Sequence, residues 1–280
     1  VVDSPDLSLN ISRELLQHDR QLKLIAANLG KKIKSELKAM LENDREKYEA
    51  FFKNFGLQLK FGVYNDYGQH KELLQDLLLF WSSKEGKDTT LAEYRERMPE
   101  DQPYYYYACG ESAEKIAKLP QVERILDKGY EVLYLTEEVD EFVMQVLAKV
   151  EEKTIKSVSD PDALPESEEE KAKVEKQAEE SKSVLDFVKE TLGDKIKEAR
   201  VSKILKSGTV CLTADGPMSI EMEKYFHKIG ETAGMKAEKV LELNADSPAF
   251  QALKAAVAGG DKDKAAKYAE LLYDQALIIA

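Results

Sequence analysis

A segment beginning at Pro103 constrains the fold more than any other part of the chain. It carries an aromatic run of strand length at 104–109, a helical stretch, a second apolar strand at 131–135 and a further helix over 139–150. Strands and helices that alternate at this spacing predict a βαβ unit with parallel strands and a right-handed crossover. We therefore expect a small three-layer α/β subdomain over residues 103–156.

The chain before this segment has a helical pattern. Apolar residues recur every three or four positions from Leu22 to Leu41, which is typical of an amphipathic helix. A second helix is predicted over 44–55, with Gly56 as its C-terminal cap. Two more helices are predicted over 70–81 and 90–98.

The second half of the chain is predicted to be α+β and rich in helices. Pro161 and Pro165 interrupt regular structure, and the acidic run after them lacks aromatic residues, so we place a domain boundary there. A long helix should then end at Gly193. The remaining predicted elements are β segments at 199–204 and 209–213, around a turn at Ser207-Gly208, and helices at 218–229, 247–258 and 262–280. The expected divisions are residues 1–156, with a helical segment at 10–98 and the α/β subdomain at 103–156, a boundary segment at 157–181, and a domain at 182–280.

Composition excludes several classes of protein. The 280 residues include 41 Lys and Arg against 53 Asp and Glu, a formal net charge of −12, which argues against a nucleic-acid-binding face. Cys109 and Cys211 lie far apart and without metal-ligand spacing, so we expect neither a disulfide nor a metal site, and we expect a reducing cytoplasmic location. No apolar run approaches the ~18 residues of a membrane span. The chain starts at Val1 and stops within a helical pattern, so we expect it to be a piece of a longer polypeptide.

Known catalytic motifs are missing from the sequence. It has no Walker motif, GxGxxG, HExxH or GxSxG, and its three histidines are scattered. A nucleotide enzyme built on the βαβ unit is disfavoured, because Gly110-Glu111-Ser112 lacks the glycines that admit a pyrophosphate. We therefore predict no complete active site and no cofactor within this chain.

Arg13 and Gln17 form a first candidate site. They lie four residues apart, and thus on one face of a helix near its N-terminus. A guanidinium, an amide and free helix N–H groups at such a place can bind an anion such as a terminal phosphate. The spacing alone is more typical of an ordinary exposed arginine.

An apolar stripe forms the second candidate site. Its members recur on one face of the predicted helix at 218–229, and they are Met218, Met222, Tyr225, Phe226 and Ile229. Two methionines and two aromatic residues make an adaptable surface suited to non-native polypeptide. The alternative is that the stripe is buried core and the chain is a noncatalytic helical protein-interaction or dimerisation module.

Residues 2–14, VDSPDLSLNISRE, closely resemble the catalytic-loop signature of the heat shock protein 90 family of chaperones, in its bacterial form. The family usually has proline where this chain has Ser8. The resemblance continues in order along the chain, through Arg97-Met98, the tyrosine run, 129–133, 139–142, 241–244 and 271–277. It implies a dimeric, ATP-driven chaperone of the stress response, of which this chain is the later middle domain and most of the C-terminal domain.

The resemblance also implies roles for individual residues. ATP and Mg are bound by an N-terminal domain outside this chain, so the chain alone should hydrolyse no ATP. Arg13 would contact the γ-phosphate and Gln17 would support the closed state. Client contacts fall on Met218, Met222, Tyr225 and Phe226, with Phe142 and Gln145 as middle-domain partners. A homodimer interface falls on the last helix, at Tyr268, Leu271, Leu272, Ala276 and Ile279, and we expect truncation to weaken it.

Overall fold

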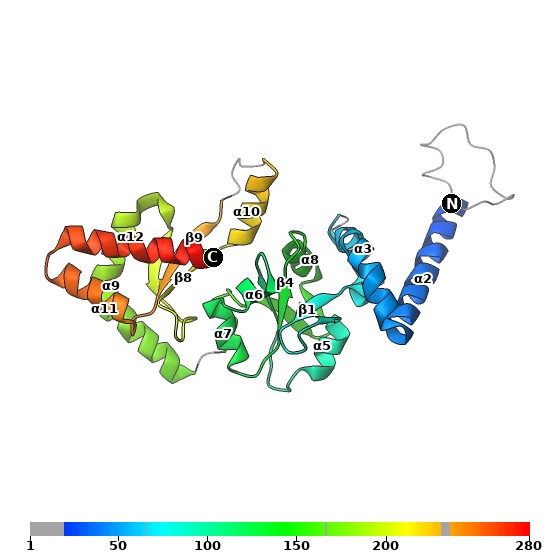
Figure 1. Cartoon of the computed structure of the whole chain (residues 1–280), viewed down its shortest axis with the longest axis horizontal. Helices are drawn as coiled ribbons and strands as arrows, with labels where there is room; N and C mark the ends of the chain where they lie inside the picture. Colours follow the sequence, from blue (N-terminus) through cyan, green and yellow to red (C-terminus); the bar gives the residue numbers. More distant parts are fainter. Residues whose placement is uncertain (1–19, 66, 166, 231–235) are drawn as a thin grey trace. The chain divides into compact units, whose positions relative to one another are not determined.

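The protein is described by a computed structural model that covers residues 20–65, 67–165, 167–230 and 236–280 (Figure 1). It combines helices with two β-sheets. The chain separates into two compact units, residues 1–79 with 90–92, and residues 80–89 with 93–280. Among the described residues, no helix combines the length and the apolar character needed to cross a membrane.

The first unit is helical. Helices α2 (Arg20–Asn43) and α3 (Arg45–Tyr64) are joined at Asp44, whose carboxylate caps α3 by accepting a hydrogen bond from the Lys47 amide at 3.2 Å. The short helix α4 (Lys71–Leu74) and a 3₁₀ turn follow. The core of this unit is a small cluster in which Tyr48, Leu77 and Leu79 are buried, and the end of α2 packs on it through Leu37, Met40 and Leu41.

Two predictions for this unit are wrong in a way that packing explains. Helix α3 does not end at Gly56 but continues to Tyr64, because Gly56 is buried against the ring of Phe52, where an added Cβ would come within 2.6 Å. The predicted helix at 70–81 stops early and gives way to a strand. The apolar residues from Leu77 to Phe80 are buried consecutively, as in an extended segment enclosed on both sides.

The first sheet contains the predicted βαβ unit. Strands β3 (Tyr105–Cys109) and β4 (Val132–Leu135) are parallel, as predicted. Strand β6 (Lys153–Ser157) pairs with the other edge of β3 and is also parallel to it. Short strands complete the order β2-β1-β4-β3-β6-β5, with β1 at Phe80–Ser82, β2 at Asp88–Thr89 and β5 at Lys149–Val150.

Helices pack on both faces of this sheet. Ser112 caps α6 (Ala113–Ile116), and Pro120 opens a second helix, α7 (Pro120–Leu126). Both helices contribute to an apolar cluster with Tyr106 on one face. On the other face, Tyr94 of α5 (Leu91–Arg97) meets Tyr105 edge-on, with ring centroids 5.1 Å apart. The helix predicted at 139–150 is α8 (Asp140–Leu147), which ends where Ala148 adopts a positive φ of 55°.

The second sheet belongs to the last part of the chain. Strands β7 (Glu198–Val201) and β8 (Val210–Asp215) match the two predicted β segments, but they do not pair with each other. Strand β9 (Glu238–Leu243) lies between them, parallel to β7 and antiparallel to β8. This central strand was not predicted from the sequence.

Four helices accompany the second sheet, and all were predicted. They are α9 (Glu168–Leu192), α10 (Ile220–Lys228), α11 (Pro248–Ala258) and α12 (Lys262–Ile279). A capping box at Ser167 and Glu170 starts α9, and Gly193 ends it. Helices α9, α11 and α12 cover the sheet and share its core through Val188, Phe250 and Leu272.

Candidate functional site

Helix α10 begins at a hydroxyl that also fixes it to helix α8. The Ser219 Oγ caps α10 by accepting a hydrogen bond from the Met222 amide at 3.0 Å. The same oxygen donates to Oε2 of Glu141, in the first turn of α8, at 2.6 Å. Near the other end of α10, Lys228 forms an ion pair with Glu138, just before α8. Two polar contacts therefore hold α10 alongside α8.

Three aromatic rings meet between these two anchors. Phe142 of α8 contacts Tyr225 and Phe226 of α10 edge-on, with ring centroids 5.4 and 5.9 Å apart. Tyr225 and Phe226 are themselves 5.5 Å apart. Beside them, Gln145 Nε2 lies 3.3 Å from Met222 Sδ. We refer to Phe142, Tyr225 and Phe226 as the aromatic cluster.

The structure thus brings together five of the six residues that the resemblance assigned to client contacts. Phe142 and Met222 are buried, Tyr225 and Phe226 are half-buried, and Gln145 is exposed. Met218 lies just before α10 and is half-buried. The stripe is therefore neither wholly core nor wholly exposed. It packs against α8 and leaves one edge open to solvent.

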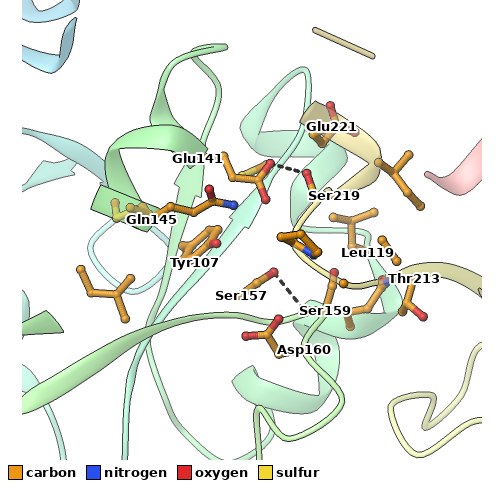
Figure 2. A pocket seen from close by; sticks show the side chains of 18 of the residues that line it. Tyr107, Leu119, Glu141, Gln145, Ser157, Ser159, Asp160, Thr213, Ser219 and Glu221 are labelled. Atoms are coloured by element: carbon orange, nitrogen blue, oxygen red, sulfur yellow. Dashed lines mark hydrogen bonds between the residues drawn. The ribbon is translucent and has the colours of Figure 1, made fainter. Parts of the chain in front are cut away.

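A cavity of about 420 Å³ lies next to this junction (Figure 2). Glu141 and Gln145 of α8, Tyr107 of β3, Asp160 of the segment before α9 and Glu221 of α10 all line it. Burial raises the pKa of Glu141 to about 7, and the nearby Glu221 and Asp160 add to the rise. Burial also raises the pKa of Asp160.

Sequence reasoning did not single out this cavity. Asp140 and Glu141 open a helix, where acidic residues are common because of the helix dipole, so their pattern predicts an exposed first turn. Both are buried in the structure. The signal was weak and local: two acids in the first turn of a helix whose next residues are apolar.

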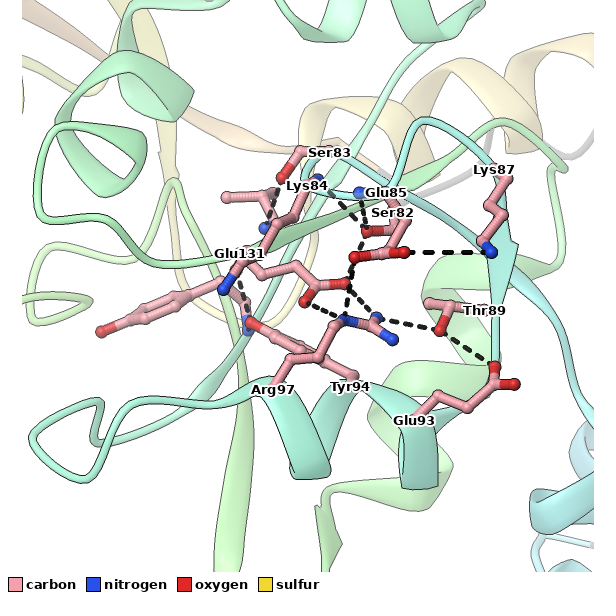
Figure 3. A network of polar contacts seen from close by, with 12 residues as sticks. Ser82, Ser83, Lys84, Glu85, Lys87, Thr89, Glu93, Tyr94, Arg97 and Glu131 are labelled. Atoms are coloured by element: carbon pink, nitrogen blue, oxygen red, sulfur yellow. Dashed lines mark hydrogen bonds and ion pairs between the residues drawn. The ribbon is translucent and has the colours of Figure 1, made fainter.

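A second polar cluster surrounds Glu131, the residue before β4 (Figure 3). Glu131 is 2% exposed. Its carboxylate accepts two hydrogen bonds from Arg97, one from Nε at 3.1 Å and one from Nη2 at 2.7 Å. The Ser82 hydroxyl of β1 donates to the same carboxylate at 2.6 Å, and Arg97 also donates to Thr89. The cluster links β1, β2, α5 and β4, so we interpret its role as structural.

The residues predicted for the dimer interface divide into two groups. Leu272 and Ala276 are buried in the apolar core that covers the second sheet, so that part of the apolar face already has a partner. Tyr268 and Ile279 are half-buried, whereas Leu271 is 64% exposed and its neighbour Ile278 is 86% exposed. The use of this helix in a dimer stays a prediction.

The phosphate-binding candidates, Arg13 and Gln17, lie outside the described residues. At the β3–α6 turn, an added Cβ on Gly110 would come within 2.8 Å of Ile116. The absence of a side chain at Gly110 therefore allows Ile116 to pack against the turn. Within the described ranges, no group of three or more His, Cys, Asp or Glu side chains is arranged to hold a metal ion.

Comparison with known proteins agrees with the resemblance seen in the sequence. The model of the family described as Hsp90 protein matches residues 1–280. The chain belongs to the Hsp90 family. It is 57% identical to the chaperone protein HtpG of Clostridium acetobutylicum, 55% identical to that of Clostridium perfringens and 54% identical to that of Bacillus subtilis. Each match covers 100% of this chain but 44% of the relative.

These matches confirm the predicted family and its bacterial form. The chain spans less than half the length of the curated HtpG relatives that it matches. The activity of those whole proteins is therefore a matter for proposal.

Proposed function

We propose that this Hsp90-family chain is part of a molecular chaperone and supplies a surface that binds non-native client polypeptide. The aromatic cluster carries the proposal. Its rings come from two helices, α8 and α10, and contact one another edge-on, while Tyr225 and Phe226 stay half-buried. Edge-on aromatic contacts and a methionine re-pack at low cost, which suits a surface that accepts varied apolar side chains.

The exposed end of helix α10 extends this surface. Ile229 follows Phe226 on the same side of the helix and is exposed. A client segment with apolar residues is therefore proposed to lie along the open edge of α10, contacting Phe226 and Ile229, with Gln145 of α8 beside it. Backbone groups of an extended client would find a polar partner in the Gln145 amide.

Removing one ring of the cluster tests this surface. We expect Phe226→Ala to weaken the binding of a permanently unfolded, fluorescently labelled protein about tenfold, because it deletes a half-buried aromatic contact. Fluorescence anisotropy titration measures the dissociation constant. The matched control is Phe55→Ala in helix α3, an exposed ring outside the cluster. Equal weakening by the two substitutions would refute the proposed surface.

Arg13 is proposed to serve ATP hydrolysis in the longer protein. The proposal rests on the sequence resemblance, which also includes Gln17, four positions further along the sequence. It rests equally on the fixed positive charge of a guanidinium near a transferred phosphoryl group. ATP and Mg would be held by a part of the protein outside this chain. We expect Arg13→Ala in the full-length protein to lower ATP turnover at least tenfold while nucleotide affinity is retained; unchanged turnover would contradict the role.

The exposed residues of α12 are proposed to take part in homodimerisation. Leu271 and Ile278 expose large apolar side chains, in contrast to the buried Leu272 and Ala276. Apolar side chains exposed on one helix favour a partner surface. The partners proposed for the chain are thus non-native clients and a second copy of itself.

A further inference from the structure

The cavity beside α8 and α10 has walls suited to an alkyl chain. Its volume of about 420 Å³ lies in the range of small-molecule sites. Several apolar side chains line it, and they are Leu119, Met144, Ile155, Leu212 and Ile220. Phe142, Tyr225 and Phe226 do not line this space, although Gln145, which lies beside the proposed client surface, does.

The charged groups of the cavity have one sign. Three carboxylates line it, from Glu141, Asp160 and Glu221, and the described lining includes no lysine, arginine or histidine. Glu221 has an ion-pair partner outside the cavity, Lys224, at 2.7 Å. Glu141 is only 8% exposed, and its polar partner is the neutral hydroxyl of Ser219. A buried carboxylate without a cation is costly in its charged form.

The cavity lining also contains a buried hydrogen-bond acceptor without a partner. Gln121 lines the cavity and is 5% exposed. Its Nε2 donates to the carbonyl of Leu212 at 3.4 Å, and Leu212 also lines the cavity. Its Oε1 is buried and has no hydrogen-bond partner among the described residues. Buried acceptors are nearly always paired, so a donor is missing at this place.

We propose that this cavity binds the ammonium group of a primary amine carried on an alkyl chain. An ammonium offers one positive charge and three N–H donors, which match the Glu141 carboxylate and the unpaired Gln121 oxygen. The apolar walls then receive the alkyl chain. A metal ion fits less well, because the described carboxylates do not gather into a metal-binding group.

The same chemistry has two sources, a free alkylamine or the lysine side chain of a bound peptide. The first probe is n-butylammonium chloride, titrated into the chain by NMR at pH 8 and constant ionic strength. Its neutral counterpart, n-butanol, is the control ligand. We expect the ammonium to bind at least tenfold more tightly than the alcohol; equal affinities would overturn the proposal.

Two substitutions locate the binding. Glu141→Gln keeps an acceptor for the Ser219 hydroxyl but removes the charge, and we expect at least tenfold weaker binding of n-butylammonium. Gln121→Leu removes the unpaired oxygen without touching Ser219, and about a threefold loss is expected. Glu175→Gln, on the exposed face of α9, is the matched control and should bind like the unmodified chain. If neither cavity variant weakens binding, the proposed site is wrong.

A second ligand pair separates the two sources. A short lysine-containing peptide is compared with the same peptide acetylated on its lysine. Binding that is lost on acetylation and weakened by Glu141→Gln assigns the site to lysine side chains. If n-butylammonium binds and neither peptide does, the site takes free alkylamines. Because none of these ligands needs the aromatic cluster, Phe226→Ala should leave n-butylammonium binding unchanged even if client binding fails.

Discussion

Replacing Arg97 by alanine is expected to destabilise the protein by about 3–5 kcal/mol, because the substitution leaves the buried Glu131 carboxylate without its cation. Arg97 makes two hydrogen bonds to that carboxylate, at 3.1 and 2.7 Å, and Glu131 is almost completely removed from solvent. The Ser82 hydroxyl alone cannot compensate a full negative charge. The midpoint of thermal unfolding, followed by circular dichroism, measures the loss.

Arg95 provides the control on the same helix. It lies two residues earlier in α5, and its contact with Glu151, at 3.6 Å, is between two exposed side chains. Exposed ion pairs contribute about 0–1 kcal/mol, so Arg95→Ala should shift the midpoint little. If the two alanine variants melt at the same temperature, the Arg97–Glu131 pair does not have this structural role.

The sequence allowed the helices and the βαβ unit to be predicted because their signals are local. Gly193 marks a helix end by its own backbone chemistry, and it lies where it was expected. The parallel pairing of β3 and β4 follows from the crossover that joins them. None of these predictions needs knowledge of distant residues.

Strand β9 could not be predicted in the same way, because its pattern depends on a distant partner. Glu242 is buried in the middle of this central strand. Read from the sequence alone, a glutamate argues against a core strand. In the structure Arg200 of β7 neutralises it at 2.6 Å and Thr213 of β8 donates to it at 3.2 Å. Periodicity along one segment contains no information about partners on neighbouring strands.

In the candidate site, too, only the features with a local sequence signal could be predicted. The stripe on α10 was visible from its helical spacing, whereas its contact with Phe142 entered through the family resemblance alone. The cavity was not foreseen, since it depends on Ser219 of α10 reaching Glu141 of α8. Burial of an acidic first turn is a property of the packed domain, and the turn itself does not encode it.

Replacing Glu141 by glutamine is expected to raise the stability of the protein at pH 8 by about 3 kcal/mol and to leave it nearly unchanged at pH 4. In the folded protein, burial raises the pKa of this carboxyl from 4.5 to about 7. Between these two values the folded state retains a proton that the unfolded state has released, so stability falls as the pH rises. Above pH 7 the cost of the buried charge is present in full, and glutamine removes it.

Thermal unfolding at pH 4 and pH 8, in buffers free of amines, measures this difference. The groups that face Glu141 are Glu221 of α10, Asp160 before α9, and Tyr107 and Cys109 of β3. The hydrogen bond that the Ser219 hydroxyl donates to Glu141 lowers the pKa, but the effect of burial is larger and raises it. Glu175→Gln should follow the unmodified chain at both values of pH. A Glu141→Gln variant that is less stable than the unmodified chain at pH 8 would show that the ionised carboxylate is favourable in the folded protein. It would thereby exclude burial as the dominant effect on its pKa.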